Sequence, residues 1–131
     1  MKKKTIAIIL VLIIVVLFTS FLLGTGFMVR TDVILVDYAV STDGTTLTFK
    51  AGVPTSMGYI RGFENKYGGG VKPHYLTFYS TFGGFNSSFG AKNEFVLDLG
   101  KDDAEIYFNR PDGGYELVLQ KNIITGEWER V

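Results

Sequence analysis

The most constraining feature of this sequence is an uncharged, apolar stretch close to its start. Lys2, Lys3 and Lys4 precede Thr5–Val29, a stretch that contains no charged side chain. As a helix, these residues would extend about 38 Å, which exceeds the roughly 30 Å of a bilayer's hydrocarbon core. The stretch therefore predicts one transmembrane helix with the lipid bilayer as its partner.

The basic residues next to this stretch predict its orientation. Three lysines lie on the N-terminal flank, and basic flanks stay on the cytoplasmic side of a membrane. We therefore expect residues 1–30 to form a cytoplasmic tail and a signal-anchor helix. Residues 31–131 would form an extracytoplasmic domain at the cell membrane, joined to the helix by a short tether at Arg30–Asp32.

A cleaved signal peptide is the competing interpretation, and it would make the protein secreted. Signal peptides usually carry about 7 to 15 apolar residues before a small-residue cleavage site. Here the apolar stretch is longer, and its nearest approach to such a site is Gly24-Thr25-Gly26. These features favour an uncleaved anchor.

Charge and cysteine content narrow the possible partners. After Val29 the chain has ten basic and thirteen acidic residues, which gives a net charge of −3. That balance lacks the basic surface of a nucleic-acid-binding protein. The chain has no cysteine, so the domain cannot form disulfides and must be stabilised by a single hydrophobic core.

Beyond the apolar stretch, apolar and polar residues alternate with a period of two, which is typical of strands. Turn signals such as Asp43-Gly44 and Pro111–Gly114 separate these segments. The pattern predicts an all-β domain of seven to eight strands, either an antiparallel sandwich or a small barrel. In the hairpin that turns at Pro111–Gly114 we expect Phe108 to lie near Leu117, with Tyr115 and Leu119 also facing the core.

Few residues point to catalysis or metal binding. His74 is the only histidine and is expected at an exposed or half-buried strand end, without a nearby serine elbow. Calcium would need six to eight oxygen ligands, and the best candidates are four acidic residues: Asp98, Asp102, Asp103 and Glu105. Their spacing fits a solvated turn better, so we expect neither a metal nor another cofactor.

A hydrolase that acts on envelope material through two carboxylates is an alternative to a non-catalytic domain. The acidic residues that could form such a pair are Asp37, Glu64, Glu94 and Glu105. Nothing in the sequence selects two of them, so we expect the domain not to be an enzyme.

The most unusual loop is rich in phenylalanine. Phe82, Phe85 and Phe89 alternate with glycines between two predicted strands. In one interpretation the rings turn inward and close one end of the core. In the other, at least one ring stays exposed beside Tyr79, and Asn86 adds hydrogen bonds to a ligand. A mixture, with some rings buried and one exposed, is also physically reasonable.

Three segments, "TSMGYIRGF", "LTFYSTFGGFNSSFGAKNEF" and "EIYFNRPDGGYELVLQKNIITGEWE", carry a resemblance. Together they look like small uncharacterised membrane-anchored or exported proteins of Gram-positive bacteria. The resemblance implies a bacterial envelope setting and no particular activity. We expect an extracytoplasmic binding module with a protein partner rather than a glycan. A purely structural subunit of a membrane complex is a further alternative.

Overall fold

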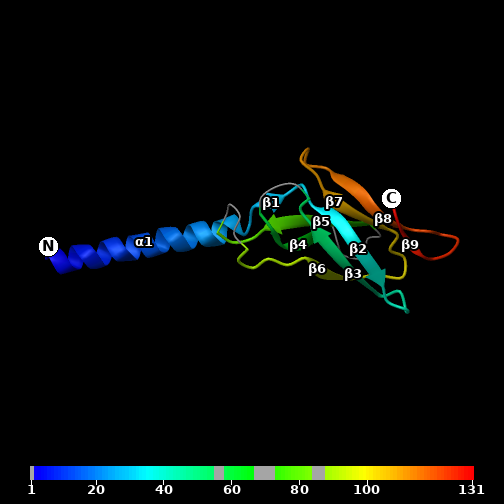
Figure 1. Cartoon of the computed structure of the whole chain (residues 1–131), viewed down its shortest axis with the longest axis horizontal. Helices are drawn as coiled ribbons and strands as arrows, with labels where there is room; N and C mark the ends of the chain where they lie inside the picture. Colours follow the sequence, from blue (N-terminus) through cyan, green and yellow to red (C-terminus); the bar gives the residue numbers. More distant parts are fainter. Residues whose placement is uncertain (1, 55–57, 67–72, 84–87) are drawn as a thin grey trace.

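The computed structural model describes residues 2–54, 58–66, 73–83 and 88–131, and it combines one long helix with a β domain. Helix α1 spans Lys3–Thr25 and extends away from one end of the β domain, as Figure 1 shows. Among the described residues it is the one helix long and apolar enough to cross a membrane, a property that signal sequences share. At 1.5 Å per residue it is about 35 Å long.

Helix α1 ends earlier than the apolar stretch suggests. Val29 and Arg30 form strand β1, which pairs with Tyr79 and Phe78 of β5 (Pro73–Ser80). The span expected over Thr5–Val29 therefore corresponds to a helix that stops at Thr25. The expected tether at Arg30–Asp32 is also wrong in part, because Arg30 belongs to a sheet.

The strands form two sheets, and no closed barrel is found among the described residues. The six-stranded sheet contains β1 and β5 together with β4 (Ile60–Lys66), β7 (Glu105–Asn109), β8 (Tyr115–Lys121) and β9 (Trp128–Arg130). The three-stranded sheet has the order β2 (Ile34–Val40), β3 (Thr46–Gly52) and β6 (Glu94–Asp98). The described residues thus contain nine strands rather than seven or eight, the additional one being β1.

One strand pair departs from the expected antiparallel arrangement. Strands β5 and β7 are parallel, with His74 opposite Ile106 and Leu76 opposite Phe108. Parallel pairing is possible because the chain between them enters the other sheet as β6 before it returns. The six-stranded sheet is therefore mixed, whereas the three-stranded sheet is antiparallel.

Asn109, the last residue of β7, connects three strands. Strands β7 and β1 lie one after the other along the same edge of β5, and Asn109 lies where they meet. Its side-chain oxygen accepts from the Phe78 backbone N–H at 3.2 Å, and its amide group donates to the Arg30 carbonyl at 2.9 Å. The Asn109 side chain is buried, and its two bonds satisfy backbone groups of β5 and β1.

The core consists of side chains from both sheets, centred on phenylalanine rings. Phe49 of β3 lies 5.5 Å from Phe95, 5.7 Å from Phe63 and 6.1 Å from Phe108, measured between ring centroids. Such distances and tilted geometries are favourable for aromatic pairs. The rings thereby connect the inner faces of the two sheets.

The hairpin of β7 and β8 differs from its expected register. Leu117 lies opposite Tyr107 and Glu116 opposite Phe108, and the register shifts between Ile106 and Tyr107. Such a bulge moves the residues that follow it to the other face of a strand. The expected contact between Phe108 and Leu117 is therefore wrong, whereas Leu119, which was expected to face inward, belongs to the buried core.

Different interactions connect the two sheets along their two sides. On one side, Arg130 donates to the carbonyls of Leu35 and Val36, and the Tyr38 hydroxyl donates to the Trp128 carbonyl. On the other side, residues 91–93 connect the two sheets through backbone hydrogen bonds. The Lys92 N–H donates to the Ile60 carbonyl, and the Ala51 N–H donates to the Asn93 carbonyl.

Candidate functional site

The end of α1 is hydrogen-bonded directly to the β domain. The Thr25 hydroxyl donates to the Leu22 carbonyl and accepts from the Gly83 N–H at 2.7 Å. The Thr25 carbonyl accepts from the Ser80 hydroxyl, and the Ser80 backbone N–H donates to the Met28 carbonyl. The last carbonyls of a helix lack partners within it, and here the β domain supplies one of the missing donors. Helix and domain therefore meet in an ordered junction.

Arg61 of β4 is the central side chain of this junction. Its Nε donates to the Gly26 carbonyl at 3.1 Å, and its Nη2 donates to the same oxygen. Its guanidinium lies 4.9 Å from the ring centroid of Phe82, 5.5 Å from that of Phe27 and 5.8 Å from that of Tyr79. Contacts of a cation with aromatic faces are worth about 0.5–2 kcal/mol. A positive charge at the C-terminal end of a helix is favourable as well.

Two glycines leave room for the Phe82 ring. A Cβ atom on Gly26 would lie 2.2 Å from Cε1 of this ring, and one on Gly90 would lie 3.2 Å from Cδ2 on the opposite edge. Gly90 also has a φ of +85°, which disfavours other residues. The ring therefore lies between the end of α1 and the chain that leads to β6.

The predicted site residues take different positions. The Tyr79 hydroxyl donates to Glu64 at 2.9 Å, and its ring lies near Arg61. Phe82 is half-buried in the junction and does not belong to the main core. Phe89 is 63% exposed, and its ring meets that of Phe82 at 5.9 Å. Phe85 and Asn86 lie outside the described residues. Of the three rings, one is thus packed against the helix end and one is exposed.

Sequence reasoning missed Arg61 and Gly26, which hold the junction together. The two residues are separated by 35 positions, and no local pattern connects an arginine in a strand with a carbonyl at a helix end. The one available signal is Gly24-Thr25-Gly26, where small residues permit close approach of the domain.

At the opposite end of the domain, the loop between β8 and β9 exposes two isoleucines. Ile123 is 97% exposed and Ile124 is 94% exposed. The Asn122 side-chain oxygen accepts from the backbone N–H groups of Ile124 and Thr125, and Gly126 N–H donates to the Asn122 carbonyl. These bonds fix the loop backbone, so the isoleucines are presented by an ordered turn. Figure 1 shows this loop at the end remote from α1.

His74 is more buried than expected, with 8% of its surface exposed. Its Nδ1 lies 2.7 Å from the Asn65 amide nitrogen, and its Nε2 lies 2.7 Å from a carboxylate oxygen of Asp103. An exposed or half-buried position is therefore wrong. A general base needs a ring nitrogen that can reach the substrate. Both nitrogens of His74 have protein partners, so this arrangement fixes the end of β5.

The acidic residues do not converge on one site. Within the described part of the chain, no group of three histidine, aspartate or glutamate residues could hold a metal ion. Asp103 faces His74, and Glu105 accepts from the Tyr107 hydroxyl. The Tyr79 hydroxyl and Lys66 lower the pKa of Glu64, whereas a general acid needs a raised pKa.

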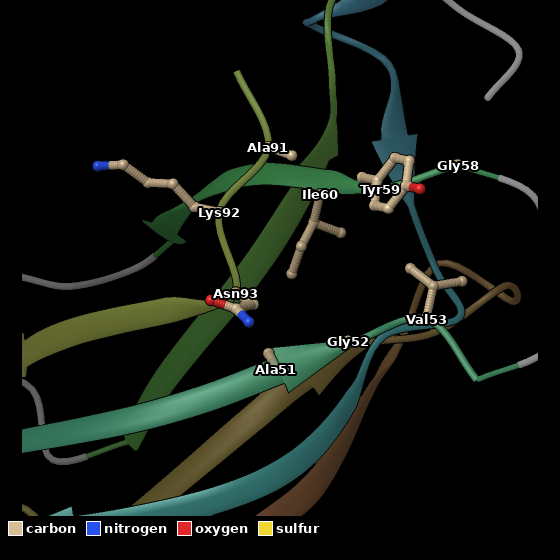
Figure 2. A pocket seen from close by; sticks show the side chains of 9 residues that line it. All are labelled: Ala51, Gly52, Val53, Gly58, Tyr59, Ile60, Ala91, Lys92 and Asn93. Atoms are coloured by element: carbon tan, nitrogen blue, oxygen red, sulfur yellow. The ribbon is translucent and has the colours of Figure 1, made fainter. Parts of the chain in front are cut away.

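A hollow of about 510 Å³ lies where β3, β4 and the segment before β6 meet. Figure 2 shows that Ile60 points into this space, whereas the Lys92 side chain points away from it. Among the described residues, its lining consists mostly of apolar side chains and glycines, with few polar side chains. Small-molecule sites usually combine an apolar lining with convergent polar groups.

Comparisons with protein-family models, with curated proteins and with solved structures found no match to this chain. Inferences about its function therefore depend on the geometry of the junction and of the loop between β8 and β9.

Proposed function

We propose that this protein is a membrane-anchored, extracytoplasmic and non-catalytic binding module of the cell envelope. Helix α1 would anchor it, with the N-terminus in the cytoplasm and the two sheets, arranged as a sandwich, outside. The hydrogen-bonded junction supports this proposal, because it would hold the domain in a fixed position relative to the helix. A fixed position favours binding by reducing the entropy lost when a partner docks.

The exposed pair Ile123 and Ile124 is the observation that carries the proposal. Two isoleucines with nearly all of their surface in water would gain free energy if a partner covered them. Side-chain and backbone hydrogen bonds of Asn122 hold their loop in one shape. A protein with an apolar pocket fits two adjacent aliphatic side chains, whereas a glycan would need aromatic or polar groups at this place.

The test is binding by the full chain with the variant Ile123→Ser, Ile124→Ser. Crosslinking in envelope membranes would identify a partner, and purified components would then measure affinity. Burial of one such side chain is worth about 1.5–3 kcal/mol, so the double variant should bind at least about 100-fold more weakly.

The matched control is Val96→Thr on β6, which replaces an apolar residue that is 60% exposed in the other sheet. This variant should keep the parent's affinity. Equal binding by the parent and the isoleucine variant would refute this surface as the binding site. A parent that captures no partner would instead favour a purely structural role.

A further inference from the structure

The β domain exposes a second apolar surface at the end that carries α1. Phe27, Met28, Val29 and Phe89, here named the collar, are large side chains that are each at least half exposed. Phe27 lies beside Arg61. The Phe89 ring contacts the Phe82 ring, which in turn packs against the end of the helix. The collar therefore surrounds the point where α1 leaves the domain.

The length of α1 relates the collar to a bilayer. Helix α1 is about 35 Å long, whereas a hydrocarbon core is roughly 30 Å thick and a whole bilayer about 40–45 Å. A helix that spans the core would place Thr25 at its outer boundary. Residues that follow Thr25 directly would then lie at the headgroup–acyl boundary, where apolar side chains such as phenylalanine bury in membrane-surface segments.

We propose that the collar is seated in the outer headgroup layer of the same bilayer that α1 crosses. The inference rests on the proposed function, because it requires α1 to be a membrane anchor. Continuity with the helix identifies lipid as the occupant of this surface. Arg61, whose guanidinium donates to the Gly26 carbonyl and lies over the Phe27 ring, holds the first residue of the collar in place.

Contact of the collar with lipid has a consequence for the rest of the domain. A single helix could tilt in the bilayer together with the domain fixed to it, whereas lipid contacts at Phe27 and Phe89 restrict that tilt. The loop between β8 and β9 lies at the opposite end (Figure 1) and would be held at a constant height above the membrane.

The absence of cysteine allows a direct test with single-cysteine variants. Phe89→Cys, Ile123→Cys and Ile13→Cys of the full chain would each carry the environment-sensitive dye NBD. All three would be reconstituted into vesicles of phosphatidylcholine and phosphatidylglycerol with lipids that bear a spin-label quencher at known depths. Ile13 reports on the helix, and Ile123 reports on the distal loop.

We expect the dye at position 89 to emit at shorter wavelength than the dye at 123 and to be quenched by shallow quenchers. The dye at position 13 should be quenched by deep ones. Emission at position 89 that matches position 123, with position 13 still quenched, would overturn the collar while leaving the anchor intact. An unquenched dye at position 13 would refute both the anchor and the collar.

Discussion

Gly26→Ala is the substitution that tests the junction most sharply. The new Cβ would lie 2.2 Å from Cε1 and 2.3 Å from Cδ1 of Phe82, whereas carbon atoms prefer about 3.5–4.0 Å. The ring would have to move by about 1.3 Å, toward the Gly90 backbone on its other edge. Gly26 has a φ of −69°, so alanine causes no backbone strain of its own.

Overpacking of this kind costs about 1–3 kcal/mol, which corresponds to a factor of about 5 to 150 in a local opening equilibrium. We expect hydrogen exchange of the Gly83 and Ser80 amides to accelerate by that factor, because the Gly83 N–H donates to Thr25 at the end of α1 and the Ser80 N–H donates to Met28 just after it. Exchange would be measured on the full chain in lipid nanodiscs.

Gly24→Ala is the matched control, because a Cβ at Gly24 meets nothing within 4 Å. It should leave both exchange rates at parent values. In a Phe82→Ala background, Gly26→Ala should cause no further acceleration of hydrogen exchange, since the ring that causes the clash is gone. Equal exchange in the Gly24→Ala and Gly26→Ala variants would refute the packed junction.

Two further predictions concern stability, and both use fluorescence of Trp128, the single tryptophan, during denaturant unfolding in detergent micelles. Asn109→Leu should lower the free energy of unfolding by at least about 2 kcal/mol, because it removes the acceptor for the buried Phe78 N–H and the Asn109 donor to the Arg30 carbonyl; an unchanged value would contradict that role. Hydrogen bonds from Ser41 and Thr45 lower the pKa of Asp43 from 3.8 to about 2. The ionised Asp43 carboxylate therefore stabilises the fold fully above about pH 4, and this stabilisation disappears as the pH falls through 2. The stability difference between the parent and Asp43→Asn should therefore narrow over this range, and a difference independent of pH would show that the ionised carboxylate contributes nothing.

The alternation of apolar residues was sufficient to predict most of the strands. Asp43-Gly44 predicted the hairpin that joins β2 and β3, and Gly44 has the positive φ that such a turn requires. Strand β1 was missed because Val29 ends an apolar stretch that is typical of a helix, and Arg30 follows it directly. Only their pairing with β5 separates them from α1.

Sequence patterns could not predict the features that depend on contacts between distant residues. Alternation looks the same in parallel and antiparallel strands, so the pairing of β5 with β7 was not detectable. The bulge beside Tyr107 leaves no local signature, although it changes which residues of β8 face the core. The phenylalanine loop was located correctly as an unusual segment, but the role of Phe82 depends on Arg61 and Gly26, which are far away in the sequence.

The central claim is that α1 crosses the membrane and carries the β domain on its outer face. Cysteine accessibility in intact bacterial cells that express the full chain tests it most directly, with Ile123→Cys and Lys3→Cys as single-cysteine variants and a membrane-impermeant maleimide as the probe. We expect Ile123→Cys to be labelled in intact cells and Lys3→Cys to be labelled only after the membrane is permeabilised, with both proteins in the membrane fraction. Labelling of Lys3→Cys in intact cells, or recovery of a shortened protein in the medium, would contradict the account.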